Sequence, residues 1–486
     1  MKDDLSSIFH KPEFKQLLAK YSDMVNNQTP VYLEPDEITL LAEYYAGIEN
    51  IKASEAVVNY GLSLHPDNLD IQIFKCHNLV ICGQTDEAQL LLNSLPDAND
   101  YEVRLLQAEI YLVQKRDQEA DEFLNQLYQD EQDIDVMLDI AHLYMNDQQK
   151  QKAYYWLQKA QDENPDHLGL LEEMASYEFT FGDPQKAVKL YNRLLDEAPY
   201  TLDFWQNLIR CYIRMNEPEK ALEALEFAMA IDETDLINWE LKSNCYLQQN
   251  RAKQAIDCLL YVEQHTTEKA YIQNILLSAY FYIQDFERIL EYSNKLLASQ
   301  KLSNFEMAPL YYKRATAYLQ LKNREACKND IRQGLAYDNH YSELYILKGE
   351  VCLEEGKLDE AKEAFHYGEL YAEDLTEAFS LIGLSYFKNE YMKEAIPYFI
   401  KQEEIAPETM GINYFLVAYS YLYLQENQQA IPYLIRGIIY APETIESDEN
   451  LAIPNGASGD FLKLVRMVTE KIRSGEINPA PFLKNK

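Results

Sequence analysis

Proline and glycine are scarce in this chain, with 17 Pro and 15 Gly among 486 residues, while 47% of the residues are hydrophobic. A chain this apolar can bury a large ordered core, so the composition excludes a disordered or low-complexity polymer. Long hydrophobic runs are missing, since nowhere do 18 apolar residues follow one another, and the first residues, MKDDLSSIFHKPEF, lack the apolar stretch of a signal peptide. We therefore expect neither a membrane-spanning helix nor export, and we predict a cytoplasmic protein.

Cysteine is limited to seven residues, and no two of them form a CxxC pair. Their number is odd, and most fall within apolar patterns of helical spacing, which is typical of reduced thiols in a core. The seven are Cys76, Cys82, Cys211, Cys245, Cys258, Cys327 and Cys352. A reducing cytosol fits this usage best.

Positive charge is in short supply. Lys and Arg number 44 against 80 Asp and Glu, which leaves a formal net charge of -36. Such a field repels phosphate backbones and anionic lipids and favours basic or neutral partners, so we expect no nucleic-acid ligand. The charge is uneven: residues 86–135 hold 14 acidic and 3 basic residues, whereas residues 461–486 hold 6 basic and 2 acidic ones.

Catalytic signatures are absent as well. The sequence contains no HExxH, GxSxG, GxGxxG or GxxxxGK[ST] motif, and its eight histidines show no i,i+4 pairing with one another. We therefore expect no enzyme, no cofactor and no metal site. Paired carboxylates occur throughout so acidic a chain, so their spacing does not single out a catalytic pair.

What the chain does have is a repeat. Proline residues that follow apolar helical runs, Pro66, Pro165, Pro199, Pro407 and Pro442, lie 99, 34, 208 and 35 residues apart, close to multiples of 34. The stretch 35–442 is 408 residues long, or twelve periods of 34. Proline lacks an N–H and disfavours helix in the residue before it, so each unit is expected to end there.

The side chains within each period resemble the tetratricopeptide family. The signature of that family has aromatic or apolar residues at positions 4 and 24, an aromatic residue at 11, small residues at 8 and 27, Ala at 20 and Pro at 32. In the window that starts at Thr376, these places hold Phe379, Gly383, Tyr386, Ala395, Phe399, Gln402 and Pro407, and only Gln402 departs. The resemblance implies an all-α, right-handed superhelical solenoid of about twelve helix-turn-helix repeats. The windows near Leu69 and Tyr271 match less well, and their phase stays open.

The domain boundaries follow from this period. We predict capping helices over residues 1–34, repeats over 35–442, a linker over 443–459, a capping helix over 460–475 and a tail over 476–486. The last helix has one apolar face, and its other face carries Lys463, Arg466, Lys471 and Arg473. A solvating cap is the favoured interpretation, and a basic helix that contacts anionic membrane is the alternative.

The resemblance also implies where a partner would bind. In this family, positions 2, 5, 9 and 12 of the first helix line the concave groove, and positions 4, 8 and 11 pack inward. The predicted groove residues are Glu109, His142, Glu172, Arg210, Arg214, Asn244, Tyr282, Tyr312, Thr316, Glu350, Phe387, Phe415 and Tyr419. The groove therefore begins acidic and histidine-bearing and becomes aromatic toward the C-terminal end.

The favoured function is a scaffold that binds a protein or peptide, of basic or apolar-aromatic character, in the groove. The Lys- and Asn-rich arrangement with which chaperone-binding members hold a C-terminal carboxylate is missing from these positions. One alternative is a structural subunit that self-associates or assembles a larger complex. Another is a regulator or an enzyme with an unrecognised site in the groove. The oligomeric state stays open.

Overall fold

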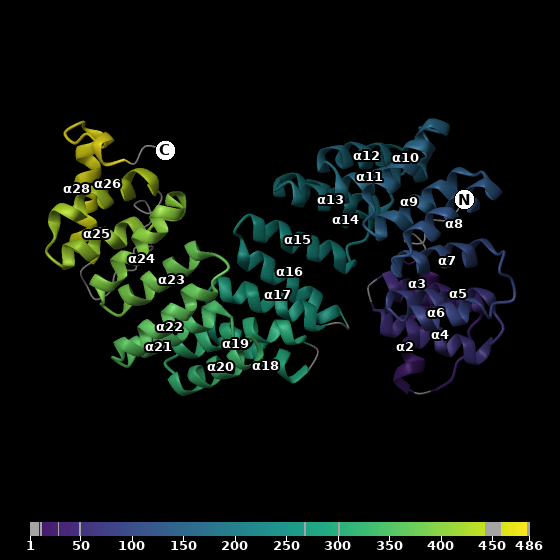
Figure 1. Ribbon diagram of the computed structural model, residues 1–486, viewed down its shortest axis with the longest axis horizontal. Helices are drawn as coiled ribbons and strands as arrows, with labels where there is room; N and C mark the ends of the chain where they lie inside the picture. Colours follow the sequence, from purple (N-terminus) through teal and green to yellow (C-terminus); the bar gives the residue numbers. More distant parts are fainter. Residues whose placement is uncertain are drawn as a thin grey trace. The chain divides into compact units, whose positions relative to one another are not determined.

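The computed structural model describes residues 9, 12–27, 29–47, 50–266, 269–299, 302–442 and 458–483. Within these ranges all regular structure is helical. None of the helices found there combines the length and hydrophobicity that a bilayer crossing requires. The chain divides into two compact units, Met1–His265 and Thr266–Lys486, called unit 1 and unit 2 below (Figure 1).

In the described part of unit 1, one N-terminal helix is followed by helix pairs. In the part that the structure describes, these are α2 (Pro12–Asn27), α3 (Pro35–Gly47) with α4 (Ile51–Leu64), α5 (Leu69–Ile81) with α6 (Thr85–Leu92), α7 (Tyr101–Val113) with α8 (Asp117–Glu131), α9 (Ile134–Asn146) with α10 (Lys150–Glu163), α11 (Leu168–Phe181) with α12 (Pro184–Glu197), α13 (Leu202–Arg214) with α14 (Pro218–Ile231), and α15 (Leu236–Gln248) with α16 (Ala252–His265).

Unit 2 continues the pattern. Its described helices are α17 (Lys269–Tyr282) with α18 (Phe286–Ser299), α19 (Asn304–Gln320) with α20 (Arg324–Tyr337), α21 (Ser342–Glu354) with α22 (Leu358–Tyr371), α23 (Leu375–Lys388) with α24 (Met392–Ile405), α25 (Asn413–Tyr423) with α26 (Asn427–Tyr440), α28 (Ser458–Arg473), and the short 3-10 helices η1 (Pro407–Thr409) and η2 (Ala480–Phe482). Within a unit, the two helices of a pair pack on each other, and the second packs on the first helix of the next pair. The predicted all-α solenoid is confirmed.

Glycine sets the distance between the two helices of a pair. A Cβ atom added to Gly383 of α23 would lie 2.7 Å from the ring of Phe399 in α24, closer than side chains normally approach. Gly349 of α21 meets the ring of Phe365 in α22 in the same way. Both rings are fully buried, so a residue without a side chain at repeat position 8 makes room for an aromatic one at position 24.

A residue with left-handed backbone conformation follows the first helix of almost every pair. These residues are Gly83, Lys115, Gln148, Asn216, Asn250, Gln284, Lys322, Gly356, Glu390 and Gln425. Asn216, Asn250 and Gln284 are 34 residues apart, whereas Gly83 and Lys115 are 32 apart and Gln284 and Lys322 are 38 apart. A left-handed residue is a common way to end an α-helix. These stops therefore define the phase of the two weakly matching windows.

A side chain in the first turn of several first helices holds the turn before it. Trp205 Nε1 donates a hydrogen bond to the Pro199 carbonyl at 2.8 Å, and Trp239 Nε1 donates to the Glu233 carbonyl at 2.9 Å. The same bond joins Tyr345 to Asn339 at 3.1 Å and Gln72 to Pro66 at 2.7 Å. Because the acceptor is a backbone carbonyl, the residue at repeat position 32 need not be proline. Gln72, an apparent departure from the pattern, makes the same contact as an aromatic residue.

The N-terminal helix covers the first pair with aromatic contacts. The ring of Phe14 lies 5.1 Å from that of Tyr44, and the ring of Tyr21 lies 6.2 Å from that of Tyr45. Phe14 and Tyr21 are both buried. The apolar surface of α3 that no preceding repeat covers is thereby removed from water.

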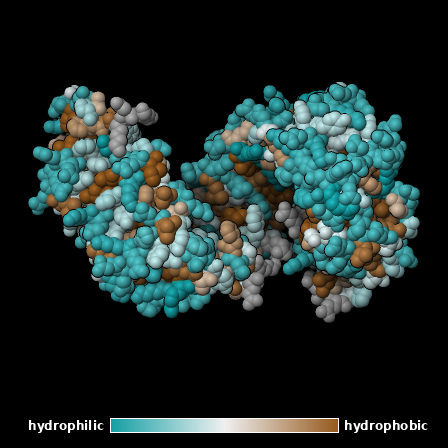
Figure 2. Space-filling model, in the orientation of Figure 1, coloured by the Kyte–Doolittle hydropathy of each residue, from teal (hydrophilic) through white to brown (hydrophobic). Residues whose placement is uncertain are grey.

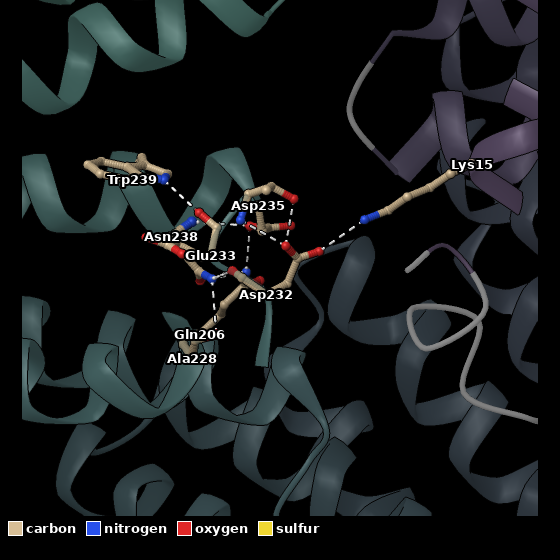
Figure 3. A network of polar contacts seen from close by, with 9 residues as sticks. Lys15, Gln206, Ala228, Asp232, Glu233, Asp235, Asn238 and Trp239 are labelled. Carbon is tan, nitrogen blue, oxygen red and sulfur yellow. Dashed lines mark hydrogen bonds and ion pairs between the residues drawn. The ribbon is translucent and has the colours of Figure 1, made fainter. Parts of the chain in front are cut away.

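Unit 1 curves far enough for α2 to reach the turn between α14 and α15. Lys15 Nζ lies 3.4 Å from Asp232 Oδ2, although the two residues are 217 positions apart (Figure 3). The turn itself is held by buried Asn238, whose Nδ2 donates to the Asp232 carbonyl at 3.0 Å and whose Oδ1 accepts from Gln206 at 3.0 Å. Unit 1 is thus a curved segment of solenoid whose first helix meets its second-last pair.

The end of unit 2 is covered by α28. Its residues Phe461 and Val465 are buried in the core that α25 and α26 form. The chain after α28 is held by Arg436 of α26, whose Nε donates to the Phe482 carbonyl at 2.9 Å. Most of the predicted linker, 443–459, lies outside the described residues.

The cysteines are unpaired, and six of the seven are buried. Cys82, at the end of α5, is the exposed one. Burial raises the pKa of the Cys76 and Cys245 thiols to about 11, which keeps them protonated and unreactive at neutral pH. Among the described residues, no group of His, Cys, Asp and Glu side chains is arranged to hold a metal ion.

Candidate protein-binding surface

The first helices of successive pairs lie directly against one another. Helix α5 packs on α7, α9 on α11 and α13 on α15 in unit 1, and α21 packs on α23 in unit 2. An array whose elements are closest along one side curves toward that side. The first helices therefore line the concave side of each unit, which we call the inner face.

The inner face of unit 1 has two histidine–glutamate contacts between neighbouring first helices. His77 Nδ1 of α5 lies 3.1 Å from Glu109 Oε2 of α7, and His142 Nδ1 of α9 lies 3.3 Å from Glu173 Oε1 of α11. The hydrogen bond with Glu109 raises the pKa of His77, and that with Glu173 raises the pKa of His142, because a carboxylate stabilises the imidazolium ion. Both histidines are poised to become cationic on mild acidification.

The inner face of unit 2 carries a group of aromatic rings. The ring of Tyr312 in α19 lies 5.8 Å from that of Phe281 in α17 and 6.1 Å from that of Tyr341, which precedes α21. Thr316 Oγ1 donates to the Tyr312 carbonyl at 2.9 Å. All four side chains are partly exposed, so this face offers apolar surface to a partner.

Comparison with known protein families assigns the repeat. Family models described as "Tetratricopeptide repeat" match residues 179–241, 308–341 and 376–409. The last two segments coincide with the pairs α19–α20 and α23–α24, in which Lys322 and Glu390 end the first helices. The chain is a tetratricopeptide-repeat solenoid. Tetratricopeptide repeats are general protein-interaction units, and in that general sense the chain is a protein-interaction scaffold.

Solved structures of similar fold include other repeat proteins. The Cut9–Hcn1 hetero-tetramer of the APC/C is 13% identical, with coverage of 96% of this chain and 99% of that chain and a TM-score of 0.39. A tetratricopeptide repeat protein from Parabacteroides merdae is 15% identical (59% and 98% covered, TM-score 0.31), and PilW, a type IV pilus biogenesis factor, is 18% identical (43% and 96%, TM-score 0.38). These TM-scores are low, so the assignment rests on the repeat matches and the helix pairs. No curated protein matches the sequence.

The charged groove residues of this tetratricopeptide solenoid differ in their contacts. Arg210 Nη1 donates to Asn207 Oδ1 at 2.9 Å on its own helix, α13. Arg214 instead has its guanidinium 5.3 Å from the ring of Phe179 in α11, a cation–π contact. Glu172 and Asn244 are exposed on α11 and α15. The two arginines therefore do not act as one cationic pair, although they share a helix.

The predicted position of Tyr282 has to be corrected by one residue. Gln284 is the left-handed stop after α17, so repeat positions 9 and 12 of this helix are Ser278 and Phe281. The window chosen from sequence began one residue too late and selected Tyr282, whose side chain is 62% exposed. It is Phe281, and not Tyr282, whose ring contacts Tyr312 on the inner face.

The aromatic groove predicted for α23 and α25 is filled by the protein itself. Phe387, Phe415 and Tyr419 are exposed by only 1%, 0% and 9%. The ring of Phe415 packs on Gly437 of α26 and occupies the space that a side chain at position 437 would fill. The ring of Phe461 in α28 lies 5.4 Å from that of Tyr419. These three residues belong to the core of unit 2.

Figure 2 shows hydrophobic residues gathered over α24 and α25, whereas the surface over α8–α10 is mostly hydrophilic.

Glu350 remains on the inner face but already has partners. Its carboxylate lies 3.8 Å from Lys388 Nζ and accepts a hydrogen bond from Ser385 Oγ at 3.4 Å. Two other glutamates, Glu343 and Glu377, occupy repeat position 2 in α21 and α23 and are not among the predicted groove residues. The 34-residue spacing between them was the signal that could have found them.

Proposed function

We propose that this scaffold binds an extended or helical segment of another protein along the inner faces of its first helices. The observation that carries the proposal is that, within each unit, successive first helices carry exposed or partly exposed side chains on their inner face, among them His77 and His142 in unit 1 and Tyr312 in unit 2. A long wall of modest contacts suits a segment that lies along it, rather than a small molecule in a closed cavity.

The chemistry of the two inner faces supports different partner surfaces. In unit 1, Glu109, Glu172 and Glu173 make the face acidic, which favours a basic segment. In unit 2, the half-buried rings of Phe281 and Tyr312 favour an apolar or aromatic segment, because such rings bury much area with few rotatable bonds.

The test first captures binding partners and then locates the surface that they cover. The full chain is immobilised, a lysate is passed over it in 0.1 M and 1 M salt, and each retained protein is identified and then purified. Hydrogen exchange of the chain is measured with and without that protein. Protection confined to the first helices supports the proposal, and protection confined to the second helices contradicts it.

Salt and concentration separate the remaining possibilities. A partner lost at 1 M salt indicates the acidic face of unit 1, because exposed charge pairs are screened over a few ångströms at that ionic strength. Light scattering across a hundredfold range of concentration reports self-association. A mass that rises with concentration, without any heterologous partner, would favour the self-assembling subunit instead.

A further inference from the structure

The rings of Phe281, Tyr312 and Tyr341 form a half-open wall on the inner face of unit 2, called the aromatic wall below. Tyr312 is inclined by 55° to Phe281 and by 51° to Tyr341, so the rings are tilted and not stacked. All three side chains are partly exposed. Part of their π-surface is therefore available to a ligand.

Two carboxylates lie beside the aromatic wall. Glu343 and Glu377 are in the first turns of α21 and α23, one repeat apart. Burial raises the pKa of Tyr312 and of Tyr341, and the negative charges of Glu343 and Glu377 add to the effect on both. Burial also raises the pKa of Glu343, and the charge of Glu377 adds to it. Glu343 follows Tyr341 by two residues, and α21 packs on α23, so both carboxylates lie on neighbouring first helices beside the ring of Tyr341.

Neither carboxylate is neutralised from within the described residues, where no ion pair joins Glu343 or Glu377 to a lysine or arginine. Lys313, the neighbour of Tyr312, donates to Ser278 Oγ of α17 at 2.8 Å and forms no ion pair with either carboxylate. Burial lowers the pKa of Lys313, with no carboxylate to oppose it. Glu343 is half-buried, and the exposed Glu377 is a like-charged neighbour, so the charge of Glu343 is costly unless a cation joins the pair.

Their location at helix starts accounts for only part of this arrangement. Acidic residues in a first turn are favoured by the helix dipole, wherever the helix lies. That preference does not explain why both carboxylates lie beside aromatic rings and without a cation. Glu350, on the same helix α21, differs from them because it has a cation of the protein nearby: Lys388 Nζ lies 3.8 Å from its carboxylate.

We propose that the aromatic wall, with Glu343 and Glu377, is an anchor site for a lysine or arginine side chain of a bound protein segment. The cation lies against the faces of Tyr312 and Tyr341, and its N–H groups donate to the two carboxylates. Charge complementarity selects this occupant, since an acidic or neutral side chain would leave the carboxylates unpaired. The inference rests on the proposed function, because it requires a segment on the inner face.

The experiment uses a phage-displayed library of random 12-residue peptides, selected on the immobilised full chain. The same selection is made on the double variant Glu343→Gln, Glu377→Gln, which keeps the shape of both side chains and removes their charge. Glu363→Gln is the matched control, because Glu363 is exposed on α22, a second helix. Thermal unfolding of every variant verifies that it is folded.

The expected result is that Lys or Arg is enriched about tenfold at one peptide position on the wild-type chain and on the control, the size expected for one charge-assisted contact. The double variant loses that enrichment. Equal enrichment on the double variant overturns the inference. If peptides are selected without any basic position, the inference fails while the proposed function survives, and if none are selected on any chain, both fail.

A second pair of variants tests the rings separately from the charges. Tyr312→Phe keeps the ring and should retain the affinity of a selected basic peptide. Tyr312→Leu removes the ring and should weaken that peptide about threefold, the loss of an exposed cation–π contact. Equal affinities for the two variants would exclude Tyr312 as a wall for the cation.

Discussion

On the inner face of unit 1, the pKa of a histidine depends on the charges of neighbouring side chains. His77 and Glu109 belong to different repeats, and their 3.1 Å contact joins α5 to α7. The negative charge of Glu102 also raises the pKa of His77, but by less than the hydrogen bond with Glu109 does. Since both partners are partly exposed, water screens the contact, and its main effect is on protonation rather than on stability.

The first prediction concerns this pair. Glu109→Gln should lower the pKa of His77 toward its ordinary value, because the amide hydrogen-bonds without charge, and Glu102→Gln should lower it less. Because the pKa of His77 is higher in the folded chain than in the unfolded chain, the contact adds stability. That stability is fully present below the pKa of the unfolded state and is lost as pH rises through the pKa of the folded state. The stability difference between wild type and Glu109→Gln should therefore shrink from about pH 6 to pH 8.

Histidine-selective NMR titration and urea unfolding at several pH values measure the two effects. His142, whose pKa is raised mainly by its hydrogen bond with Glu173 and only in small part by the charge of Glu109, should shift less than His77. A pKa of His77 that does not move in Glu109→Gln would show that the contact has no electrostatic effect.

The second prediction concerns the glycine at repeat position 8. Gly383→Ala places a Cβ 2.7 Å from the Phe399 ring, and a fully buried ring has little room to move. We expect a loss of about 1–3 kcal/mol, as for other overpacked cores. Gly47→Ala is the control, because a Cβ there meets nothing within 4 Å and alanine favours helix. Urea unfolding measures both, and equal effects would contradict the packing explanation.

Residue types predicted the packing positions better than the groove positions. Gly383 and Phe399 could be placed from sequence, since a small and a large residue recur at fixed positions. Phe415 could not, because whether position 5 faces the groove or the core depends on the size of position 27 in the same repeat. Gly437 at that position allows Phe415 to turn inward.

At the scale of the helix, the stops that end the first helices follow no residue type. Lys115, Gln148 and Glu390 all adopt the left-handed conformation that glycine would adopt most easily. The sequence therefore predicted that each first helix ends but left open where it ends near residues 69–100 and 270–305. A spacing of 38 residues between Gln284 and Lys322 cannot be recognised from a 34-residue period.

The third prediction tests the bond that holds the turn between pairs. Tyr345→Phe removes the hydroxyl that donates to the Asn339 carbonyl at 3.1 Å, and it should cost about 0.5–1 kcal/mol because the bond is exposed. Tyr367→Phe is the matched control. Its ring lies 5.4 Å from that of Tyr345, and the described residues offer its hydroxyl no hydrogen bond. Urea unfolding compares the two, and a larger loss for Tyr367→Phe would refute the role of the bond.

At the scale of the whole molecule, the sequence predicted a solenoid but not how far it turns. Repeat identity determines which helices pack on which, whereas curvature is the sum of small rotations that each pair adds. The contact between Lys15 and Asp232 depends on that sum over the first six pairs. No local pattern around either residue indicates it, and a net charge of -36 would favour an open array over a closed one.

The last prediction is that Lys15 restrains the curvature of unit 1 rather than its folding. Lys15→Glu sets a negative charge against Asp232, so the contact between α2 and the α14–α15 turn should open, while stability changes by less than about 1 kcal/mol, as for exposed ion pairs. Spin labels on cysteines that replace Ser22 and Glu233, in a chain with Cys82→Ser, report the distance across this contact.

The wild-type chain should give a narrow distance distribution at low salt and a broader one at 1 M salt, because salt screens the ion pair. Lys15→Glu should give a broad distribution at both. Lys20→Glu is the control, since the contacts of Lys20 are local: it lies 3.8 Å from Glu37 of α3 and donates to the Tyr32 carbonyl at 3.4 Å. A distribution that stays narrow in Lys15→Glu would mean that helix packing alone determines the curvature, and that the ion pair forms only because packing has already brought its partners together.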